Sequence, residues 1–408
     1  MNKFEQPRGI TVNRNPASPT FGRIYVANGR GAAATAAPYV RTTYQGIYML
    51  NADDTVALDT GVNPRTAGLG FTPGNTATPN RLQINKDDGQ LYICDWSDPS
   101  GGLWVTDPDV TTGINVLDGI GGVGTHGSIG GAWVEGVAGS NLRVFSSDED
   151  LAPGNSLWRY DIGSAALPYT GAPTLVGSPT ISSSQVMDVV RGGSSNYLYL
   201  TQRRSAGTEA NIFVFAEDGT FITNSLLASR AFTGISTNVD LLREVLAADI
   251  SPDGSTLAIL RANVTPTVLL VPLTNGVFNL GVTNGFNVGS TSANNRDIAY
   301  DAVGNLYVVN TSTEWMRIFS KGGSTIVTSG TDGSLDISTP PVLISVMPRP
   351  VSSRGKSDLP CAVMTGVMPK KKPKAAMKAG RAAAGSMNTA PRASVASAPR
   401  MPMIAGVR

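Results

Sequence analysis

The chain has 408 residues, of which 46 are Gly and 26 are Pro, and only 15% are charged. A composition so rich in turn residues and so poor in charge is typical of short strands joined by tight turns, and it favours an all-β fold. The two cysteines, Cys94 and Cys361, lie far apart in the chain, which excludes a disulfide framework and the paired Cys spacing of a zinc site.

The net charge of +2 hides two segments of opposite sign. Residues 348–408 hold 12 Lys and Arg against one acidic residue, whereas residues 1–347 have an excess of Asp and Glu. High Ala, Pro and Lys content with no aromatic residue predicts that 348–408 is a disordered basic tail behind a folded domain of residues 1–347. Such a tail can attract nucleic acid or an anionic membrane surface, and the alternative is a tail that is only solvated.

The first residues, MNKFEQPRGITV, run into a strand without the apolar segment of a secretory signal. The chain has no uninterrupted apolar stretch of the roughly 18 residues that a membrane helix needs, so we expect no membrane span. The compartment stays open, because the chain reads as cytoplasmic as it stands and as exported if an upstream segment precedes this start.

A pattern of short strands recurs six times along the chain. Its clearest copy is residues 296–310 with 315–323, in which an alternating strand meets a polar Gly turn, a β-rich strand and a third strand. Period-2 alternation around Gly turns predicts antiparallel hairpins. In chain order, the strands expected before this copy are residues 8–12, 22–28 and 46–51; 81–85, 89–95 and 102–106; 132–135, 142–146 and 156–161; 187–190, 197–201 and 211–219; and 248–254, 256–260 and 268–272.

These segments resemble the NHL repeat family. Pro7-Arg-Gly-Ile-Thr-Val12 matches the Pro-x-Gly-Ile-Ala start of that repeat, and Gly304-Asn-Leu-Tyr-Val-Val-Asn310 matches its Gly-Asn-Leu-Tyr-Val-Ala-Asp middle. The resemblance covers residues 7–330 and implies a six-bladed β-propeller, with a seven-bladed ring as the alternative if residues 51–80 hold an extra blade. Relatives with this repeat bind proteins, RNA or carbohydrates or act as enzymes, so the repeat indicates the fold and leaves the function open.

Closing a propeller requires contact between the last blade and the first. The segment 339–346, Thr-Pro-Pro-Val-Leu-Ile-Ser-Val, follows the sixth repeat and is a candidate for an outer closing strand. The alternative is an exposed strand that leads into the tail.

Charged residues recur near the start of the first strand in several repeats. They are Arg8, Arg81 and Arg296, with Asp188, Asp249 and Asp297 placed one residue later in their own repeats. Because the first strands of a propeller line its axis, we expect these side chains around one mouth of the axial channel. Three Arg side chains there would bind a carboxylate or a phosphate. The alternative is that the Arg and Asp side chains neutralise one another between blades.

Propeller enzymes of the gluconolactonase type, to which the chain is distantly similar, hold a metal on the axis through a Glu before the first strand and Asn or Asp from other blades. By that resemblance Glu5 and Asn295 are candidate ligands. Asp148 and Asp150 add acidic groups after a blade strand, and calcium is the candidate metal because it prefers such oxygen ligands. The alternative for acidic residues at turns is a local bond to the backbone.

No set of nucleophile, base and orienting group can be assembled from the sequence. The one histidine, His126, lies in a Gly-rich run, and no Gly-x-Ser-x-Gly elbow is present. We therefore expect a non-catalytic, monomeric propeller that binds or scaffolds through its axial face and blade loops, with a protein, a carbohydrate or a small anionic ligand as partner. The alternatives are a calcium-dependent lactonase or hydrolase and, through residues 348–408, a nucleic-acid or surface binder.

Overall fold

The computed structural model describes residues 4, 6–28, 46–52, 57, 79–95, 102–117, 129–148, 156–177, 186–203, 208–234, 239–289, 294–312, 315–321, 325–329 and 335–336. The chain divides into two units, Met1–Val346 and Met347–Arg408, and every described residue belongs to the first. The tail expected at 348–408 and the candidate closing strand at 339–346 therefore lie outside the described residues.

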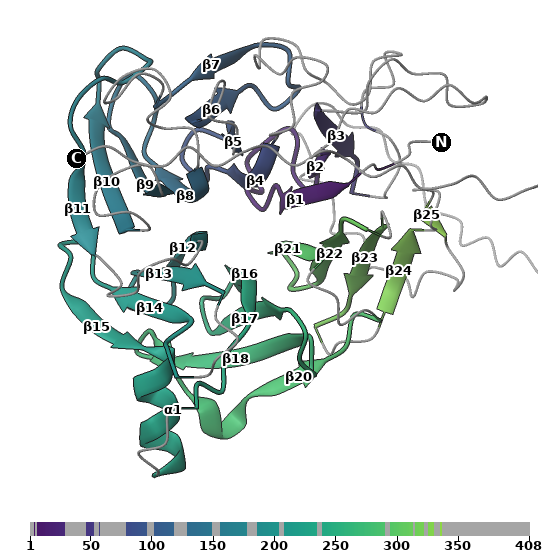
Figure 1. Cartoon of the computed structure of the whole chain (residues 1–408). Coiled ribbons are helices and arrows are strands. Elements are labelled where there is room, and N and C mark those ends of the chain that lie inside the picture. The colour runs from purple at the N-terminus through teal and green to yellow at the C-terminus, as the bar shows by residue number, and fades with distance from the viewer. Residues whose placement is uncertain are drawn as a thin grey trace, which may run out of the picture. The chain divides into compact units, whose positions relative to one another are not determined.

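Six antiparallel sheets, numbered as blades 1 to 6 in chain order, make up the described part of the first unit (Figure 1). Blades 1 to 3 consist of β1 (Pro7–Val12), β2 (Ile24–Asn28) and β3 (Gly46–Leu50); β4 (Pro79–Ile84), β5 (Leu91–Asp95), β6 (Gly102–Thr106) and β7 (Gly113–Asn115); and β8 (Ile129–Glu135), β9 (Leu142–Asp148), β10 (Ser156–Gly163) and β11 (Thr174–Gly177). Blades 4 to 6 consist of β12 (Val186–Gly192), β13 (Tyr197–Gln202), β14 (Ile212–Phe215) and β15 (Phe221–Asn224); β16 (Val245–Ile250), β17 (Thr256–Arg261), β18 (Val268–Thr274), β19 (Val277–Phe278) and β20 (Asn284–Phe286); and β21 (Asn295–Tyr300), β22 (Leu306–Asn310), β23 (Trp315–Phe319), β24 (Thr325–Ser329) and β25 (Leu335–Asp336).

The first strand of each blade contacts the first strands of the two neighbouring blades. These contacts run from β1 to β4, β8, β12, β16 and β21 and back to β1, and Figure 1 shows the same strands innermost in their sheets. The described chain is therefore a six-bladed β-propeller, as the sequence predicts. The seven-bladed alternative is wrong, because direct contact between β1 and β4 leaves no place for a blade between them.

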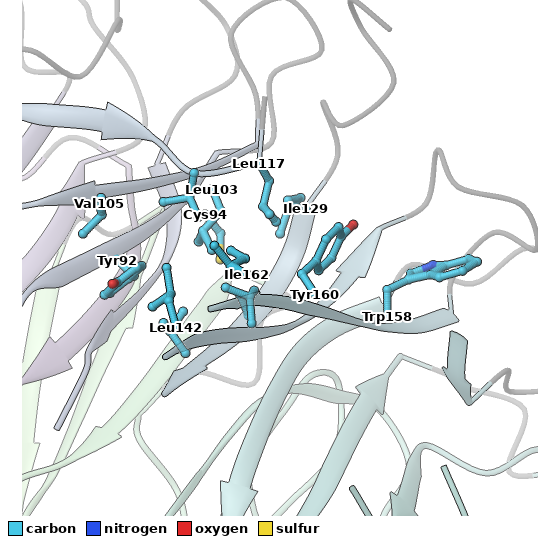
Figure 2. Packing of buried hydrophobic residues seen from close by; sticks show 14 residues of the cluster. Tyr92, Cys94, Leu103, Val105, Leu117, Ile129, Leu142, Trp158, Tyr160 and Ile162 are labelled. Carbon is cyan, nitrogen blue, oxygen red and sulfur yellow. The ribbon is translucent and has the colours of Figure 1, made fainter. Parts of the chain in front are cut away.

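The second strands of the blades are buried on both faces. Every residue of β2, β5 and β22 is buried, because each sheet is covered by its two neighbours, and strands covered on both faces are continuously apolar. Figure 2 shows the apolar layer between two neighbouring blades, in which Tyr92 and Cys94 of blade 2 share a cluster with Leu142 and Tyr160 of blade 3. The core of the propeller is thus a series of layers between blades.

Each first strand carries a β-bulge near its start. In β1 the register passes from Pro7 opposite Asn28 to Gly9 opposite Ala27, so Arg8 is the extra residue. The same irregularity occurs in all six first strands, and the extra residues are Arg8, Asn80, Gly130, Met187, Leu246 and Arg296. Positions counted from the bulge are therefore equivalent from blade to blade.

Two glycines allow neighbouring first strands to approach closely at the residue after the bulge. A Cβ on Gly9 would lie 2.5 Å from the carbonyl oxygen of Asn80 in blade 2, and a Cβ on Gly131 would lie 2.7 Å from Cα of Asp188 in blade 4. A side chain at either position would push the blades apart. These glycines are required for space at the joint between blades.

Side chains of blade 6 bind the backbone of blade 1 and close the ring. The Asp297 carboxylate accepts a hydrogen bond of 2.8 Å from the Ile10 N–H, and the Thr311 hydroxyl donates one of 2.8 Å to the Pro7 carbonyl. Phe4 lies in one apolar cluster with residues of β1, β22 and β23. In the described residues, blades 1 and 6 are each built from consecutive strands, and neither sheet takes a strand from the other end of the chain. Side-chain hydrogen bonds and apolar packing therefore join the two blades.

One α-helix, α1 (Ser225–Thr233), interrupts the β architecture of the described chain. Its N-cap is Asn224, whose side chain accepts a hydrogen bond from the Leu227 N–H, and Gly234 ends it with a left-handed φ of 66°. A 3-10 helix, η1 (Leu280–Val282), contacts α1. Neither helix is among the elements predicted from the sequence. No helix in the described ranges is long and apolar enough to cross a membrane.

Candidate functional site

The residues that directly follow the bulges form one layer around the axis, which we name the axial layer. Its members are Gly9, Arg81, Gly131, Asp188, Ala247 and Asp297. Three of them are Gly or Ala, which leaves room on the axis for the long side chain of Arg81. The three polar members come from blades 2, 4 and 6.

Arg81 spans the axis and contacts four other blades. The residue is 4% exposed. Its Nη1 donates to the Arg8 carbonyl at 3.1 Å, and its Nη2 donates to the Leu246 carbonyl at 2.8 Å. Its Nε lies 3.9 Å from the Asp188 carboxylate and its Nη1 lies 3.6 Å from that of Asp297. One buried cation therefore links blade 2 to blades 1, 4, 5 and 6.

The two carboxylates of the axial layer share this one cation. Burial raises the pKa of Asp188 to about 6 and that of Asp297 to about 8, against the lowering effect of Arg81. The two ion pairs are longer than hydrogen bonds, so Arg81 offsets the burial only in part. Backbone donors of the next blade complete the contacts, since Ala248 N–H donates to Asp188 at 3.3 Å and Ile10 N–H donates to Asp297.

A cavity of about 660 Å³ opens on one side of the axial layer. Arg81, Asp188 and Asp297 form its floor. The residues two positions further along the first strands form its wall, and they are Thr11, Gln83, Trp133, Val190, Asp249 and Ala299. The cavity therefore opens at the end of the axis where first strands turn into second strands. We name this end the hairpin mouth and the opposite end, where the first strands begin, the start mouth.

Charged groups of both signs stand at the rim of the cavity. Arg14, just after β1, lies 3.4 Å from the Asp249 carboxylate and donates to a blade 5 carbonyl at 2.9 Å. This arginine thus crosses from blade 1 to blade 5. Asp249 also accepts a hydrogen bond of 2.7 Å from the Tyr300 N–H of blade 6. Lys86, Arg191 and Asp253 also line the cavity and add further charges of both signs.

Arg8 and Arg296 lie at the start mouth. Each is the extra residue of its bulge, in the adjacent blades 1 and 6, and neither lines the cavity. Arg203, just after β13, lies near them and pairs with Glu244 at 3.0 Å. Burial, together with repulsion from Arg8, Arg81 and Arg203, lowers the pKa of Arg296 to about 10.

The six axial residues predicted from the sequence thus occupy three levels. Arg8 and Arg296 stand on the bulges, Arg81, Asp188 and Asp297 form the floor of the cavity, and Asp249 belongs to its wall. Alignment of the first strands by their charged residues takes no account of the bulge, so Arg8 and Arg296 on the bulge are matched with Arg81, which follows it. A register difference of one residue is enough to move a side chain to another level.

Arg14, Gln83 and Trp133 also shape the cavity and were not predicted from the sequence. Gln83 bonds both the N–H and the carbonyl of Val134, at 2.6 and 3.0 Å, and so holds blade 2 to blade 3. Trp133 packs against the apolar cluster between blades 3 and 4 and also lines the cavity. Counting two residues onward from the axial layer finds Gln83 and Trp133, but that count requires the position of the bulge.

The candidate metal ligands stay a prediction. Glu5 and Asp150 lie outside the described residues, as does the side chain of Asp148. Asn295 is buried at the start of β21, and its Oδ1 accepts a hydrogen bond of 2.8 Å from the Asn310 side chain. Within the described ranges, no three His, Cys, Asp or Glu side chains lie close enough to share a metal ion. Of the candidate ligands for calcium, only Asn295 has a described side chain.

No family model and no curated protein matches the sequence. Several solved structures are similar. A protein of unknown function from Bacteroides thetaiotaomicron is 12% identical with a TM-score of 0.48, over 78% of this chain and 69% of its own. Virginiamycin B lyase from Staphylococcus aureus is 14% identical with a TM-score of 0.44, over 79% and 84%. Regucalcin from Agrobacterium tumefaciens, a calcium-binding protein, is 14% identical with a TM-score of 0.34, over 81% and 75%. Similarity of this degree carries no argument about function, and the NHL resemblance rests on the sequence motifs alone.

Proposed function

We propose that this propeller is a binding protein that takes a small polar ligand, such as a sugar, in the cavity at the hairpin mouth. The cavity itself carries the proposal, because its volume is about 660 Å³, its floor is closed by Arg81, Asp188 and Asp297, and all six first strands contribute to its wall. Small-molecule sites occupy roughly 300–1,000 Å³ and combine apolar walls with a few placed polar groups. The cavity has this size and this mixture.

The chemistry of the lining supports binding more than catalysis. The polar groups of the floor already contact one another and the backbone of neighbouring blades. Neither His nor Cys is among the described lining residues. The wall offers an aromatic surface at Trp133 and a hydroxyl at Thr11, and the rim offers charges of both signs at Arg14 and Asp249. A compact ligand with one apolar face and several hydroxyls fits this combination, because aromatic rings pack on apolar faces and the polar groups fix orientation.

Filling the cavity should abolish ligand binding and leave the ring folded. Thr11 lies in the wall and is part exposed on a strand whose neighbours are buried, so Thr11→Trp places an indole in the cavity without removing a core residue. Ile114→Trp, at an exposed position of β7 outside the cavity, is the matched control. In a thermal-shift screen of monosaccharides and disaccharides, we expect the wild type and the control to respond to the same sugars.

The affinity for a sugar found in this screen can then be measured by isothermal titration calorimetry. We expect Thr11→Trp to bind it more weakly by roughly tenfold or more, which corresponds to a loss of about 1.4 kcal/mol of binding free energy. Circular dichroism should show that both variants are folded. Equal affinity in Thr11→Trp and the wild type would overturn the proposed location, and a wild type that responds to none of the sugars would overturn the proposed ligand class.

A further inference from the structure

We propose a second binding site at the start mouth, in which Arg296, flanked by Arg8 and Arg203, binds an oxyanion such as a phosphate or a carboxylate group. The axial layer lies between this site and the cavity at the hairpin mouth, and none of the three arginines lines that cavity. The two sites are therefore distinct, and this proposal does not depend on the proposed sugar site.

Arg296 is part buried, and its contacts differ from those of the buried Arg191 and Arg261. Its Nε is buried without a hydrogen-bond partner, and in the described part of the chain its guanidinium forms no ion pair. By contrast, Arg191 binds the carboxylate of Glu135 at 2.7 Å, and Arg261 donates to the Leu241 carbonyl at 3.2 Å. Burying a charged donor without an acceptor is costly. An acceptor supplied by a ligand would remove that cost.

The backbone sets Arg296 beside Arg8. Both residues are the bulged residues of first strands that contact one another, β21 and β1. The hydrogen bond from Ile10 N–H to Asp297, next to Arg296 in the chain, aligns the two strands at this level. The two side chains therefore start from equivalent positions in adjacent blades. Residues so placed can approach one ligand from two sides.

Like charges gather around Arg296. Arg8, Arg81 and Arg203 each repel its charge and, together with burial, lower its pKa. Arg81 is engaged with carboxylates and carbonyls of the axial layer, and Arg203 pairs with Glu244. Arg296 thus stands in a positive field with a guanidinium that lacks an acceptor. A planar guanidinium fork matches the two oxygens of a carboxylate or phosphate, and a bound anion would offset the repulsion.

Isothermal titration calorimetry at low ionic strength, with inorganic phosphate and separately with citrate, tests the site. We expect the wild type to bind at least one of these probes and Arg296→Gln to bind it more weakly by roughly tenfold or more. Arg296→Lys, which keeps the charge and loses the fork, should fall between the two. The matched control is Arg159→Gln, which removes an arginine that pairs with the exposed Asp161 and does not line the cavity, and which should bind as the wild type does. The probe that binds more tightly identifies the oxyanion.

Thermal unfolding separates a ligand-binding role from a structural one. Because Arg296 has no hydrogen-bond or ion-pair partner in the described structure, Arg296→Gln should unfold in the absence of anions at the wild-type Tm or above it. Added phosphate or citrate should raise the Tm of the wild type and of Arg159→Gln but not that of Arg296→Gln. A Tm several degrees lower in anion-free Arg296→Gln would assign the residue to the fold and overturn the proposal. Unchanged anion affinity in this variant, or no binding of either probe by the wild type, would also overturn it.

Discussion

Arg81 contacts blades 1, 4, 5 and 6 from a buried position in blade 2, and its surroundings decide its contribution to stability. Two carboxylates and two backbone carbonyls face its guanidinium. A buried ion pair that is broken by removing one partner leaves the other charge without compensation in a low dielectric. The loss of stability on removing Arg81 should therefore be larger than the net stabilisation that its ion pairs contribute.

At about pH 9, above the pKa values of both Asp188 and Asp297, Arg81→Met should lower the free energy of unfolding by about 3–5 kcal/mol, because two ionised carboxylates would remain buried without a cation. Urea denaturation followed by circular dichroism measures this. Arg159→Met, which breaks a pair with the exposed Asp161, is the control and should cost no more than about 1 kcal/mol. The triple variant Arg81→Met/Asp188→Asn/Asp297→Asn should recover part of the loss. An Arg81→Met protein as stable as the wild type would show that Arg81 does not hold the blades together.

The sequence identified Arg81, Asp188 and Asp297 as residues of the axis but not their separation from Arg8 and Arg296. Their place in the first strands follows from the repeat, which is visible in the sequence. Their level on the axis depends on the bulge, and nothing in the residues before Arg81 marks Asn80 as the extra residue. Bulge position depends on pairing with a second strand, which a single strand does not show.

The second strands of all six blades were predictable from the sequence, because burial on both faces makes them rich in apolar and β-branched residues. Expected segments such as 197–201 and 256–260 lie on β13 and β17. The outer strands were not predicted. β7 and β15 contain no buried residue, so they lack the apolar alternation that signals a strand. Helix α1 was also missed, although Asn224 followed by Ser-Leu-Leu-Ala is a recognisable N-terminal cap.

Gly131→Ala should destabilise the joint between blades 3 and 4. The added Cβ would lie 2.7 Å from Cα of Asp188 and 2.8 Å from the backbone nitrogen of Val189, and neither atom can move without shifting β12. We expect a loss of roughly 1–3 kcal/mol, as for other overpacked sites. Gly281→Ala is the control, because its new Cβ would meet nothing closer than 3.6 Å. Differential scanning calorimetry should show a lower Tm for Gly131→Ala alone, and equal Tm values for the two variants would contradict close packing at this joint.

The ring as a whole should lose stability as pH rises from about 5 to about 9. Burial raises the pKa of Asp188 to about 6 and of Asp297 to about 8, above the value of about 3.9 for an unfolded Asp. A group with a raised folded pKa stabilises fully below its unfolded pKa, and that contribution is lost as pH rises through the folded pKa. The chain has a single His, so few other side chains titrate in this range.

Asp297→Asn should therefore reduce the fall in Tm between about pH 5 and about pH 9, because the variant cannot ionise at this position. Asp161→Asn is the control and should keep the wild-type slope, since Asp161 is 47% exposed and pairs with Arg143 and Arg159 at the surface. Thermal unfolding across this pH range measures all three proteins. The same slope in Asp297→Asn and the wild type would show that this buried carboxyl does not titrate there.

The amino-acid pattern alone establishes six repeats of hairpin strands, because period-2 alternation, Gly turns and apolar second strands are local properties, and the resemblance of these repeats to the NHL repeat implies a propeller. It also places basic and acidic residues near the axis. Only the tertiary structure reveals that Arg81 joins Asp188 and Asp297 in a floor, that a cavity opens on one side, and that Arg296 stands without an acceptor on the other. These features depend on bulge register and on contacts such as that between Ile10 and Asp297, 287 residues apart. No local pattern encodes such a contact, since it forms only when the last blade meets the first.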